Sequence, residues 1–439
     1  MLSHHSGWLR VPALSLLSTI LVLQCAWAAP SEPLPTAPTS KDRDLSFPTF
    51  VRRIAALHPR LQAARLRWQG AQAYTRGIGH QPNPYLRLGD TLGTPIEEVN
   101  SLNQTLEISG QPGLRRSIAS RDSGIKREEL RQEGRLLTRQ LGTAYFEYWG
   151  SLARLRVARE RVGLLNELLR FAGRRLEVGE ISRNQFLRVE VEATRASADL
   201  ALAEGQERIN REALVSYLHW TPGSPLPLAE SPASEALPEP PATEWDLGTL
   251  EESLARQSSN PDLQMNQLAS ERAELQGQLS GKEMAPKLQF TAYRSRLYQR
   301  DDTINGIQLS IAIPLFDYGQ VDAEVQRWKF EKAALEVQSQ ALAVNWQQQL
   351  RQAREKLNSQ RLRKQLLGKQ ALGLLELVRM SQKGYDAGLL TILEVFDTQK
   401  AYREVLTDYI DSQVQLRQAE IELYTLMNDP LVVEEDVNP

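Results

Sequence analysis

Several residue types on which protein chemistry often depends are scarce in this sequence. Among its 439 residues there is one cysteine, Cys25, and there are five histidines. A single thiol excludes a disulfide framework and a thiolate metal cluster. The 52 Lys and Arg residues nearly balance the 54 Asp and Glu residues, so the strongly basic surface typical of nucleic-acid-binding proteins is missing. Beyond the N-terminal segment, no uninterrupted apolar run approaches the roughly 18 residues of a membrane-spanning helix. These absences disfavour nucleic-acid binding, most enzymes and a helical membrane protein.

The first 28 residues are expected to be an export signal. Arg10 precedes an apolar run at 11–23, and Ala26-Trp27-Ala28 has the small-x-small pattern of a cleavage site. A retained membrane anchor is one alternative. Lipid attachment at Cys25 is another, but Gln24 stands where lipoprotein processing requires a small residue. The chain is therefore predicted to be exported.

The rest of the chain repeats one plan twice. The segment that begins at Pro59 resembles the one at Pro261, and RLEVGEIS at 175–182 resembles GYDAGLLT at 384–391. A stretch rich in proline separates the halves, and no helix interior tolerates such a stretch. The predicted organisation is a signal peptide at 1–28, a draped or disordered Pro-rich leader at 29–48, a first repeat at 49–220, a Pro-rich linker at 221–245, a second repeat at 246–428 and a tail at 429–439.

Heptad spacing predicts long helices packed side by side. Val321, Trp328, Leu335 and Leu342 recur every seven residues, as along a coiled-coil seam. We expect two long helices at about 115–177 and 320–384, each roughly 90 Å long at 1.5 Å per residue. Shorter helices are expected at about 50–80, 184–219, 246–283 and 391–428. Two short helices laid end to end would match one long helix.

Between these helices the apolar period changes from seven to two. Leu86 and Leu88 alternate with polar neighbours in the first half, as do Ile307 and Leu309 in the second. Such alternation fits either a half-buried sheet or strands of a membrane barrel, and the period does not distinguish them. Four strands are too few to close a barrel, so a membrane location requires an oligomer.

Over nearly the whole mature chain, these features resemble the TolC family of outer-membrane efflux proteins. The resemblance rests on the duplicated plan, on LEISGQPGLRR at 106–116 and on YDAGLLTILEVFD at 385–397. The stretch at 106–116 is most similar to the outer-membrane component of heavy-metal cation (cobalt-zinc-cadmium type) RND efflux systems.

The resemblance implies a mainly α fold with a small β part. Long coiled-coil helices of a homotrimer would form an α-barrel tunnel through the periplasm. Four strands per protomer would contribute to a twelve-stranded transmembrane β-barrel in the lipid of the outer membrane of a Gram-negative bacterium. The linker would lie on an equatorial belt. The protein would be a passive duct docked to a periplasmic membrane-fusion adaptor and an inner-membrane RND pump, without catalytic residues or cofactors.

Two alternatives remain open. One is a duct for drugs, small organic molecules or secreted polypeptides. The other is a soluble periplasmic coiled-coil scaffold, which would not need lipid-facing leucines on its strands. No metal site is expected, because His58, His80 and His219 are isolated in the sequence; surface or capping roles are expected for them.

The glycine turns at 178–182 and 387–391 are predicted to be tight helix–turn–helix connections. Ser182 with Gln185, and Thr391 with Glu394, have the spacing of capping boxes. The resemblance implies that these turns are the periplasmic tips that meet the adaptor. Transferred residue by residue, the adaptor-contacting positions are Val178, Gly179, Glu180, Ala387, Gly388 and Leu389.

The resemblance also implies a periplasmic gate. Glu394 and Asp397 match acidic positions of the family's constriction, with Tyr385 and Gln185 beside them. Rings of acids from three copies would favour cations, and crowding of like charges would raise some of the carboxyl pKa values. The capping box offers another explanation for Glu394.

Overall fold

The computed structural model describes residues 47, 51, 58–91, 97–218, 237–241, 243, 245, 247–297, 302–387 and 389–427. All of them belong to one compact unit. The export signal with Cys25, most of the leader and of the linker, His219, Gly388 and the tail lie outside the described residues. Within the described part, no helix combines the length and the apolar character that crossing a membrane requires.

Both halves of the chain contain the predicted series of elements. The first half has α2 (Pro59–Gly77), β1 (Tyr85–Thr91), β2 (Glu97–Glu107), α3 (Gln111–Glu177) and α4 (Arg183–Leu218). The second has α5 (Leu250–Ala255), the 3-10 helix η2 (Arg256–Ser259), α6 (Pro261–Ser280), β3 (Lys287–Leu297), β4 (Asp302–Ala312), α7 (Gln320–Asp386) and α8 (Ile392–Leu426). The order helix, strand pair, long helix, shorter helix is therefore confirmed.

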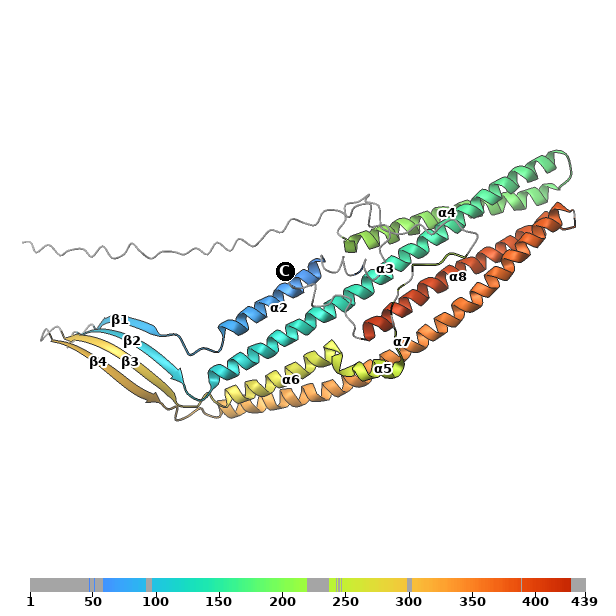
Figure 1. Cartoon of the computed structure of the whole chain (residues 1–439). Coiled ribbons are helices and arrows are strands. Elements are labelled where there is room, and N and C mark those ends of the chain that lie inside the picture. Colours follow the sequence, from blue (N-terminus) through green and yellow to red (C-terminus); the bar gives the residue numbers. More distant parts are fainter. Residues whose placement is uncertain are drawn as a thin grey trace, which may run out of the picture. The chain divides into compact units, whose positions relative to one another are not determined.

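The two long helices are the frame of the fold (Figure 1). α3 and α7 have 67 residues each, or about 100 Å at 1.5 Å per residue. α2 and α4 both pack along α3, and α6 and α8 both pack along α7, which confirms the predicted end-to-end arrangement. The halves meet where α3 contacts α6 and α8, and where β2 pairs with β3.

The helix expected at 246–283 is interrupted, which corrects the prediction. α5 and η2 end at Ser259, and α6 begins anew at Pro261. Proline cannot continue a helix, because it lacks the N–H and its ring clashes with the preceding turn. The side chain of Asn260 accepts a hydrogen bond from the N–H of Asp262 at 2.8 Å and caps the new helix. α2 begins in the same way at Pro59, where Nδ1 of His58 accepts from the N–H of Arg60 at 3.3 Å. The capping role expected for the histidines is thus confirmed at His58.

An aromatic core lies midway along α3. Phe47 is fully buried and packs on Phe146 with ring centroids 5.0 Å apart. Trp245 packs on Phe47 and stacks on Tyr424 of α8 at 4.4 Å. Burying a large apolar side chain contributes roughly 1.5–3 kcal/mol. Near the end of the predicted leader, Phe47 is therefore anchored in the core.

The four strands form one antiparallel sheet in the order β1-β2-β3-β4. Its register brings Leu86, Leu102, Ala292 and Ile307 opposite one another, and directly paired residues lie on the same face of a sheet. One face is therefore mainly apolar. It carries Leu86, Leu88, Leu102, Leu106, Leu288, Phe290, Ala292, Ile307, Leu309 and Ile311, together with polar residues such as Asn100, Gln104, Arg294 and Asn305. The other face is mainly polar and carries Arg87, Ser101, Asn103, Thr105, Gln289, Thr291, Ser295, Gln308 and Ser310.

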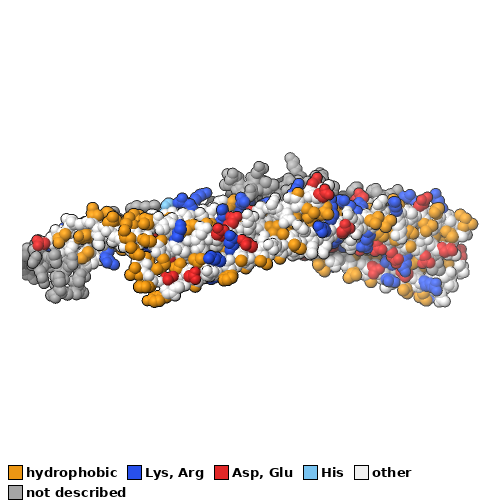
Figure 2. Space-filling model, turned by 90° about the horizontal axis from the view of Figure 1, so that it is seen from below, with side chains coloured by type: hydrophobic (Ala, Val, Ile, Leu, Met, Phe, Trp, Pro, Cys, Tyr) orange, Lys and Arg blue, Asp and Glu red, His pale blue; other side chains and the backbone are white. Residues whose placement is uncertain are grey.

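Much of the apolar face is exposed, unlike the apolar face of a water-soluble sheet. Leu86 is 64% exposed and Leu309 is 66% exposed, and hydrophobic side chains gather over this end of the surface (Figure 2). On the polar face, Ser101 and Asn103 are buried, and Nδ2 of Asn103 donates to Oγ of Ser101 at 2.9 Å. The predicted alternation is confirmed, with its apolar side turned outward.

Candidate functional site at the two helix turns

The turn between α3 and α4 is a Schellman motif. The N–H of Glu180 donates to the carbonyl of Arg175 at 2.9 Å, and the N–H of Gly179 donates to the carbonyl of Leu176 at 3.1 Å. These bonds satisfy carbonyls at the end of α3 and require a residue in the left-handed conformation. Gly179 supplies it with φ of 78°. The predicted glycine exit is confirmed here.

The turn between α7 and α8 has the equivalent long bond. The N–H of Leu389 donates to the carbonyl of Gly384 at 2.8 Å, the same step along the chain as Glu180 to Arg175. Gly388, predicted to be the exit glycine, lies outside the described residues. Side chains at the tips are exposed, with Val178 at 70% and Leu389 at 81%. Glu180 and Ala387 are exposed as well.

Both predicted capping boxes are present. The N–H of Gln185 donates to Oγ of Ser182 at 3.3 Å, and the N–H of Ser182 donates to Oε1 of Gln185 at 2.8 Å. In the second turn, the N–H of Glu394 donates to Oγ1 of Thr391 at 3.4 Å, and the N–H of Thr391 donates to Oε2 of Glu394 at 2.7 Å. α4 and α8 thus begin directly after the capping residues that the sequence spacing predicts, Ser182 and Thr391.

The cap changes the electrostatics of Glu394. The backbone N–H of Thr391, together with its hydroxyl, stabilises the carboxylate and lowers the pKa of Glu394 below its ordinary value. This direction is opposite to the rise that crowding of like charges in a gate would cause. Within one chain, the carboxylate of Glu394 therefore stabilises the start of α8.

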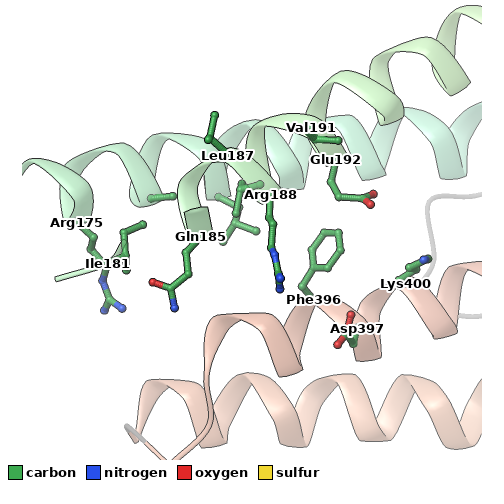
Figure 3. Close-up of a pocket in the computed structure, with 13 residues that line it drawn as sticks. Arg175, Ile181, Gln185, Leu187, Arg188, Val191, Glu192, Phe396, Asp397 and Lys400 are labelled. Carbon is green, nitrogen blue, oxygen red and sulfur yellow. The ribbon is translucent and has the colours of Figure 1, made fainter. Parts of the chain in front are cut away.

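A groove of about 390 Å³ lies between the α3–α4 pair and α8, close to the turns. Its apolar lining is Leu168, Ala172, Ile181, Leu187, Val189, Val191 and Phe396, and its polar lining is Arg175, Gln185, Arg188, Glu192, Asp397 and Lys400. Gln185 and Arg188 point from α4 toward α8, and Phe396 projects from α8 toward them (Figure 3). The lining includes Asp397 and Gln185 but not Glu394. Asp397 thus lines the groove, while Glu394 caps the start of α8.

Tyr385, the remaining predicted gate residue, contacts the other helix pair. The guanidinium carbon of Arg175 lies 5.5 Å from the centroid of the Tyr385 ring, within the range of a cation–π interaction, worth roughly 0.5–1 kcal/mol at an exposed site. Nε of Arg175 is also 3.4 Å from the carboxylate of Glu180. This contact joins the last turn of α3 to the last turn of α7.

Sequence reasoning missed several residues of the groove. Arg175, Phe396 and Lys400 were not identified as site residues, although Asp397 was. Arg188 follows Gln185 by three residues, and Lys400 follows Asp397 by three residues. This helical spacing could have placed Arg188 and Lys400 on the same helix faces as the predicted site residues. Nothing in the sequence pairs Arg175 with Tyr385, because that contact depends on how the two helix pairs lean together.

Comparison with known proteins decides the family. The family model described as "Outer membrane efflux protein" matches residues 51–218 and 253–429. The chain belongs to the outer membrane efflux protein family. It is 22% identical over 373 residues to the outer membrane efflux protein BepC of Brucella suis biovar 1, covering 82% of this chain and 74% of BepC.

Solved structures agree with this fold. CusC has a TM-score of 0.71 at 18% identity, covering 91% of this chain and 98% of CusC. The outer membrane protein VceC of Vibrio cholerae has a TM-score of 0.70 at 14% identity, covering 88% of this chain and 96% of VceC. As a member of the outer membrane efflux protein family, this chain is an outer-membrane efflux channel. Proteins of this family and fold are channels or ducts.

Proposed function

We propose that this family member is the passive exit duct of a tripartite efflux system that exports heavy-metal cations. It acts as a homotrimer, docked through its tips to a periplasmic membrane-fusion adaptor and coupled to an inner-membrane RND pump. Each copy contributes four strands to a twelve-stranded barrel in the outer-membrane lipid, and the long helices of three copies line a tunnel in the periplasm.

The observation that carries this proposal is the two-faced sheet. Its mainly apolar face is exposed, and Ser101, Asn103 and Ser295 are buried on its polar face, as expected when lipid lies on one side and a channel on the other. Within the sheet, β1 and β4 each have one edge with no partner strand. Open edges are not tolerated in hydrocarbon, where no water can satisfy the backbone groups. Closing three sheets into one ring removes every open edge. A soluble scaffold would have no use for this exposed face.

The docking part of the proposal is supported by the turns. Capping boxes and the Schellman motif fix the backbone at the ends of the hairpins, so the exposed Val178 and Leu389 are held in defined positions. Rigid apolar side chains on a fixed backbone lose little entropy on binding. The proposed adaptor contacts are those named from the sequence, with Gly388 the one residue among them outside the described part.

The lipid-facing role can be tested with two adjacent residues of β4. Ile307 is 74% exposed on the apolar face, and Gln308 lies on the polar face. Lysine near the bilayer midplane costs a barrel roughly 2–4 kcal/mol. We expect Ile307→Lys to reduce the amount of detergent-resistant trimer in outer-membrane fractions severalfold, and Gln308→Lys to assemble normally. Recovery of both variants as soluble periplasmic monomers, or equal loss of trimer in both, would contradict the proposal.

The cargo is supported by the resemblance at 106–116, which includes the ion pair of Arg115 with Glu107 at 2.6 Å. We expect a strain that lacks this gene to regain growth on cobalt, zinc or cadmium salts when the wild-type gene is supplied. Growth on a panel of drugs and small organic molecules is the matched comparison. Restored resistance to the organic panel alone would show that the metal assignment is wrong while leaving the duct intact.

A further inference from the structure

A second cavity lies where α8 ends beside the beginning of α6 (Figure 1). Its volume is about 250 Å³, and its walls come from α3, α6, α7 and α8. Thr425 and Leu426, the last two residues of α8, line it. The chain therefore leaves α8 at the wall of this cavity, which we call the junction pocket.

Two arginines of α3 bring positive charge to the junction pocket, Arg135 and Arg139. Nε of Arg135 donates to the carbonyl of Thr425 at 2.7 Å, but Nη1 of Arg135 is buried and has no hydrogen-bond partner. Arg139 is exposed and forms no ion pair or hydrogen bond with any residue that the structure describes. A buried guanidinium N–H without an acceptor is unfavourable, because it has lost the bonds that it would make to water. These free donors favour an anion in the pocket.

The acid that lines the junction pocket does not neutralise both arginines. This acid is Asp262 of α6, and its carboxylate accepts a hydrogen bond from Nε2 of Gln132 at 2.6 Å. Burial lowers the pKa of Arg135; the carboxylate of Asp262 opposes this change, and the charges of Arg131 and Arg139 add to it. With two arginines and one aspartate, the lining carries an excess of positive charge.

The predicted tail at 429–439, which lies outside the described residues, has the complementary composition. It has no lysine or arginine, and its acids are Asp429, Glu434, Glu435 and Asp436. An apolar run at 431–433 directly precedes the clustered acids at 434–436. The junction pocket has the matching surfaces, because leucines and Trp346 line it together with the two arginines. The tail therefore fits the pocket in charge and in apolar character.

The tail is also long enough to enter the junction pocket. Glu434 follows Leu426 by eight residues. An extended chain spans at most about 3.3–3.6 Å per residue, so Glu434 can lie up to roughly 26–29 Å from the end of α8. Because Leu426 itself lines the pocket, the acids at 434–436 can reach its arginines while every helix stays in place.

We infer that the tail folds back into the junction pocket, where carboxylates of 434–436 bind Arg135 and Arg139 and the apolar run at 431–433 packs on the leucines. Carboxylates supply the acceptor that Nη1 of Arg135 lacks, and hydrogen bonds between two charged groups are among the stronger ones. The bound tail links the end of α8 to α3 and α7. The inference does not rest on the proposed function, because all of its residues belong to one chain.

Disulfide formation in the full chain tests where the tail lies. In a Cys25→Ser background, Val433→Cys places one cysteine in the tail, and Gln349→Cys places another on α7 at the pocket wall. Gln348→Cys is the matched control, because Gln348 is also exposed on α7 but does not line the pocket. Outer membranes are treated with a mild oxidant, and linked peptides are measured by mass spectrometry. We expect the Gln349 pair to form its disulfide severalfold faster than the Gln348 pair, since a disulfide requires Cα atoms about 4.4–6.8 Å apart.

The dependence on charge separates binding from mere closeness to the end of α8. Arg139→Gln should slow the Gln349 disulfide severalfold, as should salt at about 1 M, which screens charges beyond roughly 3 Å. Arg139→Lys keeps the charge and should retain most of the rate. Equal rates for the Gln348 and Gln349 pairs would overturn the inference, and so would a rate that Arg139→Gln leaves unchanged. If inorganic phosphate then raises the Tm of the wild-type chain but not of Arg139→Gln, the pocket binds a free anion instead of the tail.

Discussion

Gly179 shows how a single residue positions a tip. Its φ of 78° is in the left-handed region, while the space around a Cβ at this position is empty within 4 Å. A substitution would therefore be strained by the backbone alone, by roughly 1–2 kcal/mol. The cost arises in the turn itself, away from the sheet.

We expect Gly179→Val to leave the trimer in the membrane and to reduce efflux-dependent resistance, because the tip no longer fits its adaptor. Gly163→Val is the control, since Gly163 lies within α3, has no positive φ and is also in open space. Resistance and membrane trimer are measured for both. Full resistance in the Gly179 variant would show that this turn does not couple to the adaptor. The same change at Gly388 extends the test to the second turn.

At the scale of an element, two acidic residues near the start of α8 have different partners. Glu394 is held by Thr391, while Asp397 faces the groove. A carboxyl group whose pKa is lower in the folded than in the unfolded chain stabilises the fold at pH values above its unfolded pKa. This stabilisation is lost as the pH falls through the folded pKa. Glu394 therefore stays ionised from neutral pH down to about pH 5, given an ordinary pKa near 4.3.

Single-channel recordings in planar bilayers distinguish the two acids. We expect Asp397→Asn to lower cation selectivity and block by divalent ions severalfold, since a ring of carboxylates favours cations. Glu394→Gln should have a smaller effect, because its amide oxygen still caps α8. Selectivity that changes between pH 5 and pH 7 would not come from Glu394. Unchanged selectivity in the double variant would remove both residues from the gate.

The elements themselves were predictable where a period persists over many residues. The heptad spacing in α7 predicted a long helix, and the alternation around Ile307 predicted a strand. Prediction failed where one residue acts against its surroundings. Pro261 interrupts a helical pattern that its neighbours continue, and Phe47 lies at the end of a segment that its prolines mark as a leader. The order of elements could thus be predicted, while the interruption and the anchor could not.

The site was predictable only as far as its local chemistry reaches. Capping boxes are properties of four consecutive residues, so Ser182 and Thr391 could be identified from spacing alone. The contact of Arg175 with Tyr385 joins two hairpins and has no local signature. The cap formed by Glu394 was likewise predictable from its spacing to Thr391, and the structure confirms it.

For the whole molecule, the consequence of the unpaired strand edges concerns how the channel is made. In the proposed homotrimer, each copy would carry an exposed apolar sheet face and two open sheet edges until it meets its partners. Those edges accept any extended chain, so productive assembly and aggregation compete for the same backbone groups. If three copies form the channel, as proposed, its assembly depends more steeply on concentration than the folding of one copy does. The amount of assembled channel would then depend on how quickly unassembled copies meet, as well as on the stability of the finished ring.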